Sequence, residues 1–143
     1  MGDAQRFYLD TSVYLCVLLG EAPAAKVIRM IRQALLCSSV LLVIEAERNL
    51  VRLSRAGDLS PADYEIAIQR LRTDHTHFLL KEVTMELCLT GIFPPVSTPR
   101  SNDLLHLRTA RWFQEHGGLT GFLTLDRHQR RAAEDFGLPV ARM

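Results

Sequence analysis

The sequence is poor in cysteine and lysine and has no long apolar run. Its three cysteines, Cys16, Cys37 and Cys88, lie far apart without a Cys-x-x-Cys pair, which argues against a disulfide framework or a thiolate zinc site. The uncharged stretch from Ala34 to Ile44 is well short of the ~18 apolar residues that a membrane span needs. Because Asp3 precedes any apolar run, no signal peptide is predicted. We therefore expect a soluble, cytoplasmic protein without membrane contact.

Neither sign of charge dominates the composition. The 143 residues carry 17 Lys and Arg against 16 Asp and Glu, and 48% of them are apolar. That balance excludes a disordered chain and argues against a protein that coats nucleic acid through bulk charge. Arg supplies every basic residue except Lys26 and Lys81; this favours phosphate contacts, although a biased genome composition explains the excess more simply. The length suits one domain, so we treat residues 1–143 as a single unit.

Apolar runs and helical periodicities alternate along the chain. The runs predict buried strands over residues 7–9, 40–44, 77–80 and 122–125, with a last short strand near residue 140. Apolar spacing of three and four predicts helices over residues 24–36, 45–57, 61–72, 84–89 and 101–116, and another after each of residues 10 and 126. Thr11 or Ser12 and Ser101 are the expected caps, and residues 93–99, with three prolines, form a loop. The alternation predicts an α/β fold whose parallel sheet is covered by helices on both faces.

Three acidic residues directly follow predicted strands: Asp10, Glu45 and Asp126. The carboxyl ends of parallel strands lie along one edge of a sheet, where open α/β folds place their ligand sites. A fourth acid, Asp103, lies in the first turn of the 101–116 helix. Clustered carboxylates raise one another's pKa values, and Mg²⁺ removes that cost while it activates water and neutralises a phosphodiester. Singly, each acid is better explained as a helix cap or a solvated residue; taken together, a shared metal site is an equal alternative.

Four segments carry a family resemblance: residues 8–12 (YLDTS), 43–47 (VIEAE), 99–110 (PRSNDLLHLRTA) and 123–127 (LTLDR). Their order and spacing resemble those of PIN domains, in particular the VapC-like toxin ribonucleases of type II toxin–antitoxin systems, over nearly the whole chain. The Asp-x-x-His-Leu-x-x-Ala pattern from Asp103 to Ala110 is the most specific part. Asn102 and Arg108 depart from the apolar or small residues common in that helix, which puts the fine substrate fit in doubt but not the metal site.

The resemblance implies a three-layer α/β/α sandwich around a parallel sheet of about five strands. It implies a Mg²⁺ site, in which Mn²⁺ can substitute, shared by four catalytic acids: Asp10, Glu45, Asp103 and Asp126. Glu47 competes with Glu45, which is preferred because the predicted strand ends directly before it. The implied activity is endonucleolytic hydrolysis of single-stranded or structured RNA that leaves a 5′-phosphate. Many such proteins are homodimers that a cognate antitoxin inhibits by covering the acidic pocket.

Arginines lie near these acids in the sequence. Arg100, Arg127 and Arg131 are candidate contacts to RNA phosphates, with a solvated surface as the alternative. Three further arginines follow Glu45 on one helical stripe: Arg48, Arg52 and Arg55. They could also contact phosphates, but we favour their interpretation as a solvated helix face.

Hydroxyl and imidazole side chains also adjoin the candidate ligands. Thr11, Ser12 and Thr124 can orient a carboxylate or hold a metal-bound water, while capping and strand-end hydrogen bonds are their ordinary roles. His106, one turn after Asp103, is interpreted as a packing histidine rather than a zinc ligand or general base.

Three other functions compete with a toxin ribonuclease. A PIN nuclease of RNA processing, without an antitoxin, would carry the same residues, and the sequence does not separate the two. A Mg²⁺-binding phosphoacceptor domain needs a lysine near a late strand end, where neither Lys26 nor Lys81 lies. A dinucleotide-binding module needs a Gly-x-Gly-x-x-Gly motif, and none follows Asp10.

Overall fold

Four short parallel strands form the sheet of this computed structural model, which describes residues 4–89, 95–98 and 100–143. The strands have the spatial order β3-β2-β1-β4 and are β1 (Arg6–Leu9), β2 (Leu35–Ser39), β3 (Leu79–Lys81) and β4 (Gly121–Leu123). Beyond β4, Val140 pairs with Phe122 in an isolated parallel bridge, where the last strand was predicted. The sheet is parallel as predicted, with one regular strand fewer than expected among the described residues.

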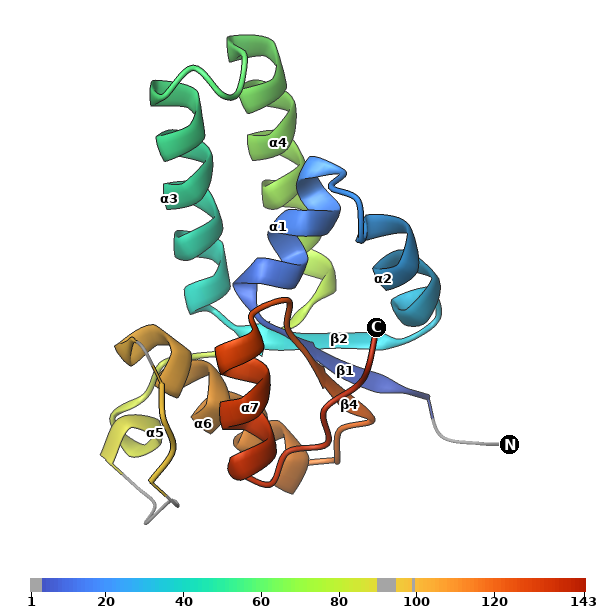
Figure 1. Ribbon diagram of the computed structural model, residues 1–143, viewed down its shortest axis with the longest axis vertical. Helices are drawn as coiled ribbons and strands as arrows, with labels where there is room; N and C mark the ends of the chain where they lie inside the picture. The colour runs from blue at the N-terminus through green and yellow to red at the C-terminus, as the bar shows by residue number, and fades with distance from the viewer. Residues whose placement is uncertain (1–3, 90–94, 99) are drawn as a thin grey trace.

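Helices cover both faces of the sheet, which confirms the predicted α/β sandwich (Figure 1). One face carries α1 (Thr11–Leu19), α2 (Ala24–Ile31), α3 (Leu41–Arg55) and α4 (Pro61–Asp74). Helices α3 and α4 form a hairpin that projects away from the sheet. The other face carries α6 (Ser101–Glu115) and α7 (Arg127–Asp135), with the short α5 (Met85–Leu89) beside α6 and a 3-10 turn (η1, His75–His77) before β3.

The side chains of β1 alternate between two hydrophobic cores. Tyr8 is fully buried on the side of α6 and α7, where its ring stacks on Phe122 at 5.4 Å. Phe7 and Leu9 point to the opposite side, into a core shared with Val27 of α2. Burial of each such side chain contributes roughly 1.5–3 kcal/mol, so a strand of four residues is enough to fix both helical layers.

The prediction of a strand over residues 40–44 is wrong, because this apolar run begins α3. The fully buried side chains of α3 recur at four-residue spacing, and the first lies within the run: Leu42, Ala46 and Leu50. The second strand is β2. The apolar pattern of the sequence does not predict it, because the polar residue Ser38 is buried in it. Its hydroxyl donates to the Leu9 carbonyl at 2.7 Å and so avoids the cost of an unpaired polar group. Glu45 therefore lies in the second turn of α3 and not at a strand end.

Two helix caps differ from the predicted ones. Asp10, rather than Thr11 or Ser12, caps α1, because it has extended backbone angles and its carboxylate accepts the amide of Val13 at 3.2 Å. The N-cap of α6 is Arg100, whose side chain makes no capping bond, and the predicted Ser101 is the first helical residue.

Several element ends also shift. Helix α2 ends at Ile31, since the last residues predicted for it belong to β2. The strand predicted over residues 77–80 begins at Leu79, after η1, and the one predicted over 122–125 is β4, which ends at Leu123. Of the predicted loop over residues 93–99, residues 95–98 lie outside helices and strands, and residues 93, 94 and 99 lie outside the described residues.

Helix length and polarity bear on membrane contact. Within residues 4–89, 95–98 and 100–143, no single helix is long and apolar enough to cross a bilayer. Only α1 and α2 taken together pass by length and composition, and they meet at a bend of 111°.

Candidate active site

The candidate site lies at the carboxyl ends of β1 and β4. The chain passes from β1 to β2 on one side, whereas β4 lies on the other side of β1, so a topological switch point separates β1 from β4. Open α/β sheets bind ligands in the crevice at such a point. Asp10 follows β1 directly, and Asp126 follows the short segment after β4. The first turn of α6 adds Asp103, and α3 adds Glu45.

Asp10 is buried, with 6% of its surface exposed. Its Oδ1 accepts hydrogen bonds from Ser12 Oγ at 2.6 Å and from the Val13 amide at 3.2 Å. Burial raises the pKa of Asp10, and hydrogen bonds from Ser12 and Thr124 oppose that rise. A negative charge at Asp10 is therefore costly to the fold, and the two hydroxyls offset only part of the cost.

Ser12 and Thr124 connect the ends of β1 and β4. Ser12 Oγ donates to Asp10 and accepts the Leu125 amide at 3.1 Å. Thr124 is buried, and its Oγ1 accepts the Asp126 amide at 3.1 Å. Both hydroxyls thus fix the loop that presents Asp126 relative to Asp10, as side chains that orient a ligand set must do.

Asp103 and Asp126 share one electrostatic environment with Asp10. Asp126 caps α7, where its Oδ1 accepts the amides of His128 at 2.8 Å and Gln129 at 3.3 Å. Burial raises the pKa of Asp103, and the negative charges of Asp126 and Asp10 raise it further. The structure therefore places Asp103 where the charges of Asp10 and Asp126, each from another element, both act on it.

Glu45 reaches toward the site from α3 and is held by side chains of two other helices. Its Oε1 accepts the Thr11 hydroxyl at 2.8 Å and lies 2.7 Å from Nε2 of His106, while Asn102 donates to Oε2 at 3.5 Å. Burial acts to raise the pKa of Glu45, but His106, followed by Thr11 and Asn102, holds it below the ordinary value. The competing Glu47 is exposed on α3.

His106 does more than the packing predicted for it from the sequence. It is buried, as a packing histidine should be, and meets Tyr8 edge-on with ring centroids 5.8 Å apart. It also lies between two hydrogen-bond partners, with Nδ1 at 2.6 Å from the Tyr8 hydroxyl and Nε2 on Glu45. Its position three residues after Asp103 places both on one helical face, which was a signal available in the sequence.

The two ring nitrogens of His106 have different partners. The pKa of Glu45 is held below its ordinary value, so its ionised carboxylate accepts the hydrogen on Nε2. Burial raises the pKa of Tyr8 far above its ordinary value, so the group beside Nδ1 is a protonated phenol. A chain of buried hydrogen bonds thus runs from β1 through α6 to the carboxylate on α3.

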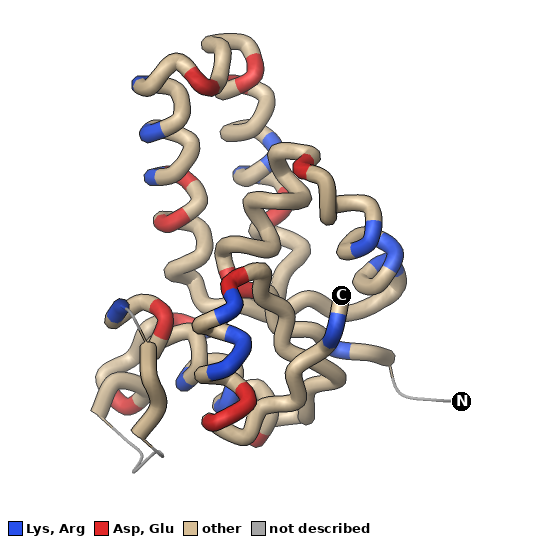
Figure 2. Tube along the Cα trace, in the orientation of Figure 1, with Lys and Arg blue, Asp and Glu red and all other residues tan. Residues whose placement is uncertain are grey.

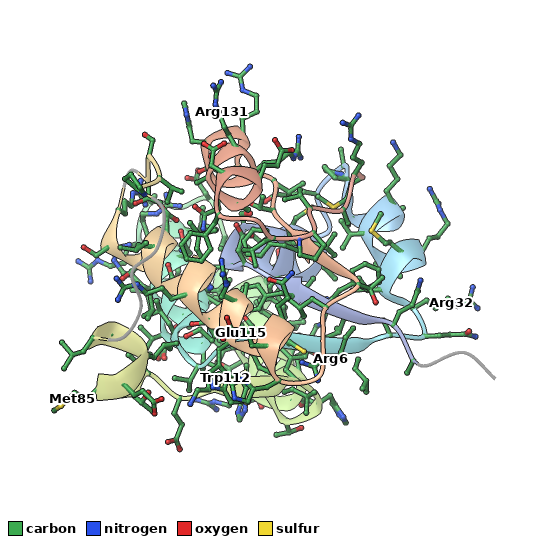
Figure 3. The ribbon with its side chains drawn as sticks, turned by 90° about the horizontal axis from the view of Figure 1, so that it is seen from below. Arg6, Arg32, Met85, Trp112, Glu115 and Arg131 are labelled. Carbon is green, nitrogen blue, oxygen red and sulfur yellow. The ribbon has the colours of Figure 1, made fainter. Side chains whose placement is uncertain are left out.

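The arginines predicted to contact RNA phosphates lie on two sides of the candidate acidic residues. Arg127 and Arg131 are exposed on α7, and Figure 3 shows Arg131 pointing outward from this helix. On the other side, Arg100 lines a hollow together with Arg48 and Arg52 of α3, whereas Arg55 is not part of its lining. The interpretation of the α3 stripe as a merely solvated face therefore misses the hollow.

The sequence matches the family model of the PIN domain over residues 7–135. The chain belongs to the PIN domain family. PIN domains are generally nucleases. Among solved structures, the crystal structure of PAE2754 from Pyrobaculum aerophilum is similar in fold, with a TM-score of 0.53 and 17% identity over 92% of this chain and 81% of that one. Comparison with curated protein sequences finds no match.

PIN domains typically bind divalent metal ions, and the donors present here fit such an ion. Asp10, Asp103 and Asp126 offer only oxygen, the ligand atom that Mg²⁺ prefers. No donor among the described residues hydrogen-bonds the Asp103 carboxylate, and His106 and Arg100 offset only part of the repulsion there, so a cation would relieve the rest.

The side chains as placed do not form one ligand shell. Among the described residues, no group of three or more His, Cys, Asp or Glu side chains could hold a metal ion. Glu45 in particular is bonded to His106 and Thr11 instead of standing beside the three aspartates. The shared site of four acids in this PIN domain thus stays a prediction.

Proposed function

We propose that this PIN domain, a single unit over residues 1–143, is a Mg²⁺-dependent endoribonuclease. The observation that carries the proposal is the convergence of three aspartates at the switch point of the sheet. Because Asp126 and Asp10 raise the pKa of Asp103, the Asp103 carboxylate lies within electrostatic reach of both. A nuclease of this family needs such a concentration of negative oxygen to hold a cation against a phosphodiester.

The roles of the acids differ with their surroundings. Asp10, Asp103 and Asp126 are proposed as the principal metal ligands, and Glu45 as the fourth, placed by His106 and Thr11. When bound, Mg²⁺, or Mn²⁺ in its place, would supply activation of water and neutralisation of charge on the phosphodiester.

The neighbouring side chains are proposed to serve this centre. Ser12 and Thr124 hold the Asp10 carboxylate in one orientation. The phosphates of the substrate are proposed to contact Arg100, Arg127 and Arg131.

The biological role is proposed from the motif resemblance described above. We infer that the protein is the toxin of a toxin–antitoxin pair, acts as a homodimer in the cytoplasm and is inhibited by an antitoxin that covers the acidic site. Purification together with the product of an adjacent small gene that encodes a DNA-binding protein supports the toxin role. The absence of any such gene supports the alternative, a PIN nuclease of RNA processing.

The activity is tested with purified protein and total RNA, in Mg²⁺ or in chelator, followed by mapping of the new ends. We expect internal cleavage in Mg²⁺ that leaves 5′-phosphates and stops in chelator. Asp10→Asn and Asp103→Asn are each expected to abolish it. Asn caps a helix as well as Asp, so the first variant keeps the cap of α1. Mg²⁺-dependent cleavage retained in both folded variants would contradict the assignment.

A further inference from the structure

A polar hollow of about 660 Å³ opens between α3 and the start of α6, beside the candidate site. It shares one wall residue, Glu45, with that site. Its other polar lining residues come from both helices and the cap of α6: Arg48, Asn49, Arg52, Arg100 and Asn102. The hollow thus adjoins the candidate site at Glu45, its only acidic lining residue, and carries three arginines.

The basic residues of the hollow have no acidic partner. The ion pairs in the described part of the chain are His106 with Glu45 and Arg111 with Glu115, so Arg48, Arg52 and Arg100 take part in none. The single carboxylate in the wall, Glu45, is already bound to His106. These three arginines therefore gather at one hollow without an ion pair in the described part of the chain, although the charge of Arg100 also acts on Asp103.

The geometry of α3 aligns two of these charges. Arg48 and Arg52 are four residues apart and so lie on one face of the helix, on the same side as Glu45. Asn49 fixes Arg52, because its Oδ1 accepts from the Arg52 guanidinium at 3.2 Å and its Nδ2 donates to the Glu45 carbonyl at 2.9 Å. Figure 2 shows basic segments spaced along α3 up to its junction with α4.

We propose that this hollow binds consecutive phosphate groups of the RNA strand on one side of the scissile bond. The proposal rests on the proposed ribonuclease activity, and it assigns Arg48, Arg52 and Arg100 as the phosphate contacts. Guanidinium groups bind phosphate oxygens through two parallel hydrogen bonds, which gives both affinity and register. Contacts of this kind position a strand without reading its sequence. Glu45, at the end of the row, then faces the reacting phosphate.

An acidic protein segment is the other class of ligand that three arginines could attract. RNA fits better, because its backbone carries a negative charge at every nucleotide. Evenly spaced negative charges match the regular spacing of the arginines along α3. Moreover, Glu45 in the wall of the hollow is a proposed metal ligand, so a strand bound there leads toward the side chains proposed to cleave it.

The test measures binding of a fluorescent single-stranded RNA of about twelve nucleotides in the Asp10→Asn background, so that cleavage does not interfere. Arg48→Ala combined with Arg52→Ala is expected to weaken binding at least tenfold. Each phosphate contact to a single strand contributes about 0.7 to the slope of log K against log salt, so the double variant should lose about 1.4. Arg55→Ala, which removes the same charge from the same helix outside the hollow, should change affinity less than twofold.

The outcomes separate this proposal from the activity. If the double variant binds RNA with the affinity and salt slope of the Arg55→Ala control, the hollow is not a phosphate site, even where the parent protein cleaves RNA. If the double variant loses RNA binding but the parent cleaves none, the hollow stands and the proposed activity fails. If RNA binding is unchanged while binding of a glutamate-rich peptide is lost, the hollow is a protein docking site and the proposal is overturned. Circular dichroism and thermal melting of each variant verify that it is folded.

Discussion

Nε2 of His106 on α6 lies 2.7 Å from Oε1 of Glu45 on α3, across 61 residues of sequence. Behind the ring, the Tyr8 hydroxyl lies 2.6 Å from Nδ1. Because the pKa of Glu45 is held below its ordinary value, its carboxylate is ionised and accepts the hydrogen on Nε2. The buried imidazole of His106 therefore helps to set both the position and the hydrogen bonding of the Glu45 carboxylate, which belongs to a helix and not to a strand end.

Replacement of His106 tests this relationship. His106→Ala leaves the buried Tyr8 hydroxyl and Glu45 without their partner, and an unpaired buried polar group costs ~1–3 kcal/mol. We expect the free energy of unfolding, measured with urea, to fall by about that amount. His106→Asn, which can still donate to Glu45, should recover part of the metal affinity that His106→Ala loses. Equal Mn²⁺ affinity of wild type and His106→Ala, measured by calorimetry, would show that His106 does not position Glu45.

Removal of the Asp10 charge should stabilise the metal-free protein. The pKa of Asp10 is raised in the fold by burial, so the native state binds its proton more tightly than the unfolded state does. The ionised form is thus penalised, and this destabilisation grows as pH rises above the unfolded pKa of about 3.9. In chelator at pH 7, Asp10→Asn should melt a few degrees higher than wild type, by about 2–4 °C per kcal/mol gained. The difference should shrink toward pH 4, and a pH-independent difference would contradict the electrostatic cause.

A bound divalent cation should raise the melting temperature of wild type more than that of a variant that has lost a metal ligand. Ligands that bind only the folded state raise its stability by mass action, about 2.7 kcal/mol at a concentration of 100 Kd. Addition of Mn²⁺ or Mg²⁺ should raise the melting temperature of wild type by several degrees and leave Asp103→Asn nearly unchanged. Asp135→Asn, at the far end of α7, is the matched control and should respond as wild type does. An equal shift in all three proteins would place the ion elsewhere.

Most of this fold could be predicted from the sequence, and the exceptions have physical causes. The alternation of strands and helices and the strand end at Asp10 are local patterns of apolar and polar residues. The boundary between β2 and α3 was missed, because a five-residue apolar run does not distinguish a strand from a buried helix turn. Buried Ser38 gave no hydrophobic signal, since its cost is removed by a hydrogen bond that the sequence does not show.

The same limit applies to the site. Asp10, Asp103 and Asp126 were chosen for their places next to predicted elements. Asp10 does follow β1 and Asp103 does lie in the first turn of α6, whereas Thr124 and Leu125 separate Asp126 from the end of β4. Glu45 was chosen on a wrong argument, the supposed strand end, but the family resemblance pointed to the same residue. Its partners His106 and Thr11 come from other elements, so only tertiary structure could reveal them. The hollow likewise joins α3 to Arg100, at the start of α6, through space.

The arginines on α7 should contribute to RNA affinity independently of the hollow. Arg127 and Arg131 are exposed beyond Asp126, and the combined change of both to Ala removes two charges without loss of packing. We expect weaker binding across all RNA sequences and a smaller salt dependence, by about 0.7 per lost phosphate contact. Fluorescence anisotropy at several salt concentrations measures both, and an unchanged slope would assign these residues to the solvated surface.

A paired comparison on α3 decides which glutamate serves the metal site. Glu45 and Glu47 are two residues apart and therefore point in different directions from the helix. Glu45 is half-buried and bonded to His106, whereas Glu47 is exposed. Glu45→Gln keeps the size of the side chain but removes the charge, so RNA cleavage in Mg²⁺ should fall by at least tenfold. Glu47→Gln removes an equal charge at the surface and should leave kcat within twofold of wild type. The reverse result would mean that α3 must rotate to present Glu47, which the burial of Leu42, Ala46 and Leu50 on its inner face opposes.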